Sequence, residues 1–395
     1  MPGSLRIARL FGITIFIHAS WVLVAILVLF NFLAFFEEGG AWQFGDFVLT
    51  VQPPVPRGEV RWVAAAATTV LFFSSVLVHE LSHALVAQRF RLPVHSITLF
   101  IFGGVANLRR EPESAKSEFL MAAVGPAASL VLGALFWVLL KLTGDTVLGD
   151  PAQQAAASVF RQIAVINVIL AVFNLLPGFP LDGGRVLRSA VWAIRRDRHT
   201  ATRIATRGGQ LLAGLLVLWG FYHLTRQDLI GGMWSMLIAF FLYNAATASY
   251  QQESFDASLR RLNVAALMTR EPTTVPVDLP LSSLVSTYIL PLRGRAFPVE
   301  RAGELLGIVS VDSVRRVPQD EWPLRRVGDV MTPSARLEPL SPEDDARRAF
   351  ERLTRAEVAQ LPVFEDGHLV GLFERDVVFG YLRMREELGL DRRRR

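Results

Sequence analysis

The residues with the clearest chemistry in this sequence are His79, Glu80 and His83, in the segment HELSH. On a helix, residues four apart share one face, so both imidazoles can reach one metal ion. Glu80 lies beside them and can take a proton from the water that attacks a peptide bond. The alternative is a polar helix face packed against other helices, but three ionisable groups in an apolar span are costly unless they are paired or metal-bound. The motif therefore predicts a metallopeptidase site.

A catalytic zinc site usually has three protein ligands and one open position. The chain has no cysteine, so the third ligand must be a histidine or a carboxylate. The best distant candidate is Asp182, in the segment NLLPGFPLDGGR at 174–185. Its prolines and glycines break a helix, and broken backbone at membrane depth survives only where it lines a protein cavity. Asp-Gly-Gly alone is an ordinary turn, but opposite HELSH we expect Asp182 to be the third ligand.

The elements that must position these residues are long apolar segments. Hydrophobic residues make up 51% of the 395-residue chain, a high share for a soluble protein. They gather in runs that approach or exceed the length needed to cross a hydrocarbon core of about 30 Å. These runs lie at 13–35, 62–90, 118–142, 159–176, 211–224 and 230–249. The pattern predicts a multi-pass α-helical membrane domain over 1–250, with about six transmembrane helices.

Basic residues are concentrated before the first run, between the second and third, and between the fourth and fifth. By the positive-inside rule, both termini are then cytoplasmic. The same topology accounts for the net charge of +5. Because the sequence shows no nucleic-acid motif, we expect no nucleic-acid partner.

Two further regions have their own patterns. The stretch 94–107 is β-branched and aromatic with a Gly-Gly turn, which predicts a short hairpin beside the membrane. From residue 251 onward the composition becomes that of a soluble domain with a weak internal repeat, at about 257–316 and 324–386. Each copy has a Met-Thr entry, a helix, a Pro-Val strand, and a second strand that leads into an Asp-capped helix. We expect an α/β C-terminal domain over 251–395.

As a set, these motifs resemble the site-2 protease family of intramembrane zinc metalloproteases, in the six-span branch with paired C-terminal cystathionine-β-synthase-type (CBS) domains. The resemblance rests on HELSH within a span and on N-x-x-P-x-x-x-x-D-G at the end of a later span. The segment Gly125-Pro126-Ala127-Ala128-Ser129 in the third span is a further match. The resemblance covers nearly the whole chain.

The resemblance implies that His79, His83 and Asp182 bind Zn²⁺, and that Glu80 is the general base and acid with a zinc-activated water as the nucleophile. It implies regulated intramembrane proteolysis of single-pass membrane proteins, for example membrane-anchored regulators of transcription. Asn174 would position the substrate or stabilise the developing oxyanion. An asparagine that bonds between helices is the alternative for Asn174.

The resemblance also implies that 94–107 belongs to a membrane-inserted sheet whose edge strand receives the substrate, as strand addition would hold an unwound segment. A plain structural hairpin is the alternative. His18, near the cytoplasmic end of the first run, could face the site. We favour a structural hydrogen bond for it over a ligand role.

CBS repeats, by the same resemblance, work in pairs and commonly bind an adenine nucleotide (ATP, ADP or AMP) through the pattern G-x-x-S/T-x-D. The first repeat keeps Gly307, Ser310 and Asp312, whereas the second has Asp376 but carries Glu374 at the hydroxyl position. A carboxylate there repels a phosphate, so we expect at most one good nucleotide site. A purely structural dimerisation module is the alternative, and a homodimer through the CBS domains is expected in either case.

The sequence therefore predicts an intramembrane zinc endopeptidase in the cell membrane of a prokaryote, with both termini and the CBS domains cytoplasmic. Two other functions stay open. A CBS-regulated membrane transporter is one, although no set of spans is repeated. A catalytically inactive relative that acts as a binding partner is the other, although the complete set of site residues argues against it.

Overall fold

The protein is described here by a computed structural model. It describes residues 4–38, 41–44, 47–50, 55, 58–100, 103–108, 112–143, 150–260, 262–292, 294–356 and 358–388. The chain divides into two compact units, Met1–Gln251 and Gln252–Arg395.

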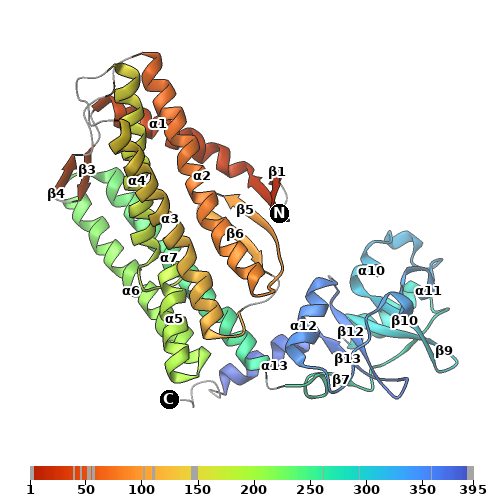
Figure 1. Ribbon diagram of the computed structural model, residues 1–395. Helices are drawn as coiled ribbons and strands as arrows, with labels where there is room; N and C mark the ends of the chain where they lie inside the picture. Colours follow the sequence, from red (N-terminus) through yellow and green to blue (C-terminus); the bar gives the residue numbers. More distant parts are fainter. Residues whose placement is uncertain are drawn as a thin grey trace. The chain divides into compact units, whose positions relative to one another are not determined.

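Long apolar helices dominate the first unit, and six of them within the described residues have the length and composition to cross a membrane (Figure 1). The chain is thus a multi-pass membrane protein, as the sequence predicts. These helices are α1 (Ala19–Glu38), α2 (Glu59–Arg89), α3 (Ala115–Thr143), α4 (Pro151–Asn174), α6 (Arg198–Thr225) and α7 (Leu229–Leu259). The boundary between the two units falls inside α7.

The first expected span was placed too early. Residues 13–18 are not helical but form strand β2 (Ile13–His18), and α1 begins at Ala19. Ile13 and Ile15 are fully buried, whereas Thr14 between them and Phe16 after them are partly exposed, which is the two-residue period of a strand. Hydropathy alone does not separate an apolar strand from the helix that follows it.

Helices α4 and α6 are longer than the apolar runs that predicted them. Their additional first turns are polar, with Gln153 and Gln154 in α4 and Arg203 and Arg207 in α6. Asp197 caps α6, because its side chain accepts a hydrogen bond from the His199 backbone N–H at 3.1 Å. A further helix, α5 (Asp182–Arg195), lies between them and was not predicted. At 14 residues, it is not among the candidate spans.

A four-stranded sheet beside α2 has the strand order β1-β2-β5-β6. Its strands are β1 (Ser4–Leu10), β2, β5 (Val94–Phe100) and β6 (Gly103–Leu108). The predicted hairpin is confirmed as β5 paired antiparallel with β6, with residues 101 and 102 outside the described residues. Strands β2 and β5 run parallel. Ile13 and Ile97 from this sheet pack against Leu81 and Ala84 of α2. A separate two-stranded sheet pairs β3 (Ala41–Phe44) with β4 (Phe47–Thr50).

The second unit consists of two similar α/β repeats. The first contains η1 (Val264–Ala266), β7 (Thr269–Arg270), β8 (Val275–Pro276), α8 (Leu281–Ser283), η2 (Leu284–Ile289), α9 (Leu290–Leu292), β9 (Ala296–Arg301), β10 (Glu304–Ser310), α10 (Val311–Arg315) and η3 (Gln319–Glu321). The second contains α11 (Val327–Val330), β11 (Thr332–Pro333), η4 (Ser334–Arg336), α12 (Ala346–Arg355), β12 (Gln360–Glu365), β13 (His368–Glu374) and α13 (Arg375–Glu387). The unit has two apolar cores, and each includes residues of both repeats, with Val264 and Leu267 in one and Val327 in the other as the residues that cross over.

The two repeats exchange their entry strands. Strand β7, from the first repeat, pairs with β13 of the second, and β11, from the second, pairs with β10 of the first. The hairpin turns also match, because Ala302-Gly303 and Asp366-Gly367 both have positive φ angles, as two-residue turns between twisted strands require. The expected Asp cap is wrong for the first repeat, where Ser310 is the N-cap of α10 and accepts from the Ser313 N–H.

Candidate active site

Helix α2 presents both histidines of the HELSH motif to one buried point. His79 and His83 lie one helical turn apart, and both residues are buried, with exposed fractions of 4% and 9%. Their Nε2 atoms are 3.2 Å apart, and the ring planes meet at 77°. The edges of the two rings therefore converge, as the four-residue spacing predicts.

Asp182, the first residue of α5, brings a carboxylate to the same point. Its Oδ2 atom lies 3.1 Å from the Nε2 atom of each histidine. The three potential ligand atoms lie within 4.8 Å of one another. Ligands about 2.0–2.1 Å from one tetrahedral zinc ion stand about 3.3 Å apart, so the three atoms are spaced as zinc ligands would be.

Helix α3 orients both rings through their other nitrogen atoms. His79 Nδ1 lies 2.9 Å from the Ser129 hydroxyl, and His83 Nδ1 lies 2.5 Å from the carbonyl oxygen of Met121. Such partners fix the ring orientation and the tautomer at metal sites. The sequence singled out Ser129 only as part of a motif. The Met121 contact uses a backbone carbonyl, which no residue type reveals.

The Met121 contact also settles where the proton of His83 lies. A carbonyl oxygen only accepts hydrogen bonds, so Nδ1 carries the proton, and in the neutral ring Nε2 then carries a lone pair. That lone pair faces Asp182 Oδ2 and His79 Nε2 at 3.1 Å and 3.2 Å. A cation between these atoms would stabilise such a convergence of electron-rich groups in a buried place. The residues therefore fit a metal ion.

Glycines allow this close packing. A Cβ atom on Gly125 of α3 would lie 2.2 Å from His83 Nε2 and 2.7 Å from His79 Nε2, so a larger residue would enter the place where the ligand atoms meet. Gly183 and Gly184 follow Asp182, and Cβ atoms there would lie 2.2 Å from the Leu175 oxygen and 2.4 Å from the Gly178 backbone. Asp-Gly-Gly is thus the first turn of a helix that lies directly against backbone, rather than an ordinary turn.

Glu80 is half-buried beside the two rings. Its carboxylate is within electrostatic range of both histidines, Asp182 and Arg185. A carboxylate in this place can exchange a proton with a molecule held at the convergence point.

The other two site candidates in the membrane unit make local contacts. Asn174, the last residue of α4, donates a hydrogen bond to the Leu170 carbonyl of its own helix at 3.0 Å. This is neither of the contacts expected for Asn174, and its role toward a substrate stays a prediction. His18 Nδ1 lies 2.9 Å from the Ser20 hydroxyl, the structural hydrogen bond that the sequence favoured.

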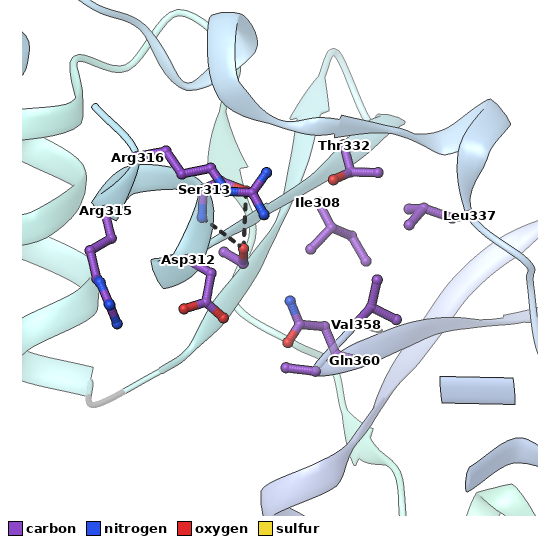
Figure 2. Close-up of a pocket in the computed structure, with 11 residues that line it drawn as sticks. Ile308, Asp312, Ser313, Arg315, Arg316, Thr332, Leu337, Val358 and Gln360 are labelled. Atoms are coloured by element: carbon purple, nitrogen blue, oxygen red, sulfur yellow. Dashed lines mark hydrogen bonds between the residues drawn. The ribbon is translucent and has the colours of Figure 1, made fainter. Parts of the chain in front are cut away.

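A cavity of about 530 Å³ lies between the two CBS repeats, and residues of both repeats line it. Figure 2 shows Asp312 and Thr332 among its lining residues, and Ser310 lines it as well. Gly307 lies outside this lining. A Cβ atom there would lie 2.3 Å from the Thr332 carbonyl oxygen, so the glycine allows β11 to pack closely against β10. The part of Gly307 in nucleotide binding stays a prediction.

The corresponding residues of the second repeat each contact a residue of the first repeat. Glu374 stands where Ser310 stands in the first repeat, and it accepts a hydrogen bond from the Thr269 hydroxyl at 2.7 Å. Asp376 lies 3.8 Å from the guanidinium of Arg295. Asp376 does not line the cavity between the repeats.

Comparison with known proteins agrees with both halves of the chain. The model of peptidase family M50 matches residues 67–216, and the CBS domain model matches residues 264–320 and 327–383. Rip3 of Mycobacterium tuberculosis, assigned as a zinc metalloprotease, is 31% identical over 357 residues, which cover 89% of this chain and 86% of Rip3. The protein sll0528 of Synechocystis, assigned likewise, is 29% identical over 381 residues, or 95% of this chain and 94% of its own.

A solved structure, the site-2 protease from Methanocaldococcus jannaschii, is 26% identical and aligns with 62% of this chain and 95% of its own, with a TM-score of 0.41. The similarity to Rip3 spans most of both chains. This chain therefore belongs to peptidase family M50, the site-2 protease family of zinc metallopeptidases, and carries two CBS domains.

Proposed function

We propose that this chain cleaves the membrane-embedded segments of other membrane proteins at a zinc site formed by His79, His83 and Asp182. One observation carries the proposal. Two ring nitrogens and a carboxylate oxygen meet at 3.1–3.2 Å in a buried place, and the proton of His83 is committed to the Met121 carbonyl on the other side of the ring. Two nitrogen ligands and one oxygen ligand leave a fourth position open, as in catalytic zinc sites.

Zinc held by His79, His83 and Asp182 would supply Lewis-acid chemistry: it would polarise the scissile carbonyl and make a bound water molecule easier to deprotonate, so that this water could attack the carbonyl. Glu80 takes the proton of that water on a carboxylate oxygen and then delivers it to the leaving amine. Met121 and Ser129 hold the imidazoles so that their Nε2 atoms keep facing the reaction centre. Asn174, at the end of α4, positions the substrate or supports the developing oxyanion from the side of the α4–α5 connection.

The substrate class follows from the place of the site. The histidines are buried in a helix with the length and composition of a membrane span. We propose that the substrates are single-pass membrane proteins, such as membrane-anchored regulators of transcription, which release a cytoplasmic fragment. A helical substrate hides its peptide bonds, so a segment must unwind before attack. The sheet β1-β2-β5-β6 beside α2 has two edges at which such a segment could add as a strand.

The distribution of basic residues supports the cell membrane of a prokaryote as the location, with both termini and the CBS domains cytoplasmic. The relatives Rip3 and sll0528 come from bacteria.

The direct test uses Glu80→Gln in purified protein reconstituted with a model transmembrane substrate. Cleavage should fall by about 10²–10⁴-fold, the usual contribution of a general base, whereas the zinc content should stay at the wild-type level because Glu80 is not a ligand. Turnover by the variant at the wild-type rate would remove the peptidase assignment. Unchanged cleavage after complete removal of zinc by a chelator would do the same.

We further propose that an adenine nucleotide binds the cavity between the repeats and regulates the membrane site. Its volume of about 530 Å³ lies in the range of small-molecule sites. Arg315 and Arg316 line it together with Asp312 (Figure 2), which supplies positive charge for phosphates and a carboxylate for a ribose. A nucleotide regulates only if it binds two arrangements of the module with different affinity. The CBS domains also join two chains as a homodimer in this proposal.

Titration calorimetry with the full-length protein in detergent tests this second proposal. Asp312→Ala should weaken binding of AMP, ADP or ATP by about 10–100-fold, because it removes a charge-assisted hydrogen bond. The matched variant Asp376→Ala should change affinity little, since that carboxylate pairs with Arg295 outside the cavity. If none of the three nucleotides binds the wild-type protein, the proposal fails, and the second unit is left as a dimerisation or substrate-docking module.

A further inference from the structure

A buried ion pair joins the two helices that complete the metal site. The Glu118 carboxylate of α3 is fully buried, and its Oε1 atom accepts hydrogen bonds from the Nε and Nη2 atoms of Arg188 in α5, the first at 2.6 Å. Arg188 itself is only 7% exposed. Helices α3 and α5 lie side by side at this end of the unit (Figure 1).

Glu118 belongs to the face of α3 that orients the histidines. Going along α3, Glu118, Met121, Gly125 and Ser129 are three or four residues apart, so they share one side of the helix. Met121 and Ser129 bond the two rings, and Gly125 leaves room for them. Any movement of α5 relative to this face changes the distance between Asp182 and both rings.

Arg188 also holds the segment that leads into Asp182. Its guanidinium lies 4.9 Å from the ring centroid of Phe179, three residues before Asp182. The Phe179 ring is buried, and its backbone N–H donates to the Ala205 carbonyl of α6 at 3.1 Å. Arg188 therefore joins α3 to both α5 and the connection that precedes it.

Stability alone does not account for this pair. A buried ion pair gains little net stability, because the cost of removing both charges from water offsets their attraction. Among the described residues, the Glu118 Oε2 atom has no hydrogen-bond partner, which adds to that cost. What a planar guanidinium fork provides is a fixed direction. The metal site requires such a fixed direction. Two of its ligands are on α2 and the third is on α5, while α3 orients the two histidine rings, so α3 and α5 must keep a fixed relative position.

We infer that Glu118 and Arg188 are positioning residues for the metal site, which keep the Asp182 carboxylate at ligand distance from His79 and His83. They touch neither the ligands nor the reacting atoms in the contacts described above, and act through the backbones of α3 and α5. This inference rests on the proposed zinc site.

The test is the zinc affinity of Arg188→Lys, which keeps the charge but loses the fork. Apo protein, full-length and in detergent, is titrated with zinc in competition with a chelator. We expect the dissociation constant to rise about 10–100-fold, as for other supporting partners of metal ligands. The absorption spectrum of the cobalt-substituted protein should change as well, because it reports the geometry of the ligands.

The chain offers a matched control in Arg61→Lys. Arg61 is 8% exposed, and its Nη1 atom lies 3.1 Å from Glu37 Oε1. It stands 18 residues before His79 on α2, or about 27 Å along the helix. Both variants should lower thermal stability, but Arg61→Lys should leave the zinc dissociation constant and the cobalt spectrum unchanged. Equal zinc affinity in Arg188→Lys and wild type would overturn the inference.

Two further variants cover the cases in which Arg188→Lys does not fold or the proposed zinc site is itself wrong. If Arg188→Lys does not fold, the double variant Glu118→Met, Arg188→Met replaces the charges with side chains of similar volume, which buried pairs often tolerate. The double variant should fold, and its zinc dissociation constant should be about tenfold or more above that of the wild type. A dissociation constant equal to that of the wild type would overturn the inference. His83→Ala separates the two proposals. Equal zinc binding by His83→Ala and wild type means that the proposed site is wrong, and the positioning role with it.

Discussion

The two parts of the chain use the same residue types in opposite ways. On α3, Ser129 and Gly125 both help to position the metal ligands. Ser129 bonds a ring nitrogen of His79, and Gly125 leaves room for the rings of His79 and His83. In the first CBS repeat, Ser310 and Gly307 are engaged by the fold itself. Ser310 caps α10, and Gly307 lets β11 pass close to β10.

This difference teaches where a motif reports function and where it reports fold. A metal centre requires side-chain atoms at fixed mutual distances, so the residues that the motif names are the ones that converge. The nucleotide pattern is built over a strand end and a helix start, where glycine and serine have structural roles of their own. Of the three residues in the pattern, Gly307 and Ser310 have structural roles, whereas no structural contact is described for the Asp312 side chain.

Among the variants that distinguish the metal site from the CBS unit, Asp182→Ala is expected to have the largest effect. Two histidines alone leave a zinc ion under-coordinated, so zinc content and cleavage should both fall by more than about 100-fold, beyond the loss of a supporting partner. Metal analysis of the purified protein measures the first and a transmembrane substrate the second. Asp197→Ala is the control, because Asp197 caps α6 in the same unit and should keep its zinc. Wild-type zinc content in Asp182→Ala would show that the third ligand is another residue.

A smaller effect is expected for Ser129→Ala, which removes the partner of His79 Nδ1. The zinc dissociation constant should rise about 10–100-fold without unfolding the protein. Ser75→Ala is a suitable comparison, because Ser75 is also buried, one turn before His79 on α2, and its hydroxyl bonds the Leu71 carbonyl and the Asn167 amide at 2.9 Å and 3.0 Å. If both serine variants bind zinc equally well, α3 does not orient His79.

The smallest effect belongs to Ser310→Ala in the CBS unit. Loss of the cap on α10 should lower the free energy of unfolding of this unit by about 1 kcal/mol, and zinc affinity should stay unchanged. Thermal denaturation and nucleotide titration of the same preparation give the two readings. A loss of nucleotide binding with unchanged stability would contradict this account, and would make the serine hydroxyl a ligand contact rather than a cap.

The sequence predicted which side chains converge, His79, His83 and Asp182, better than it predicted the elements around them. HELSH and the DGG segment could be connected because zinc needs a third ligand and the chain offers no cysteine. The Met121 carbonyl could not be predicted, since backbone atoms carry no signature in the sequence. The pair of Glu118 and Arg188 was equally hidden, because 70 residues separate its members.

The missed elements have a common physical cause. Strand β2 is continuous with the apolar run of α1, so a hydropathy window merges them. Helix α5 is too short and too polar on one face to resemble a span. The hairpin β5–β6 was predicted, because its β-branched residues and Gly-Gly turn are local signals. The exchange of β7 and β11 between the repeats depends on tertiary packing, which a sequence repeat does not show.

X-ray absorption at the zinc edge, recorded on the purified full-length protein, tests the central claim most directly. We predict about one zinc ion per chain, with two imidazole nitrogens and oxygen ligands at about 2.0–2.2 Å. Histidine scattering should be halved in His83→Ala, if that variant retains zinc at all. A spectrum without imidazole scattering, or stoichiometric zinc that persists when His79 and His83 are both replaced by alanine, would contradict the assignment of the metal site.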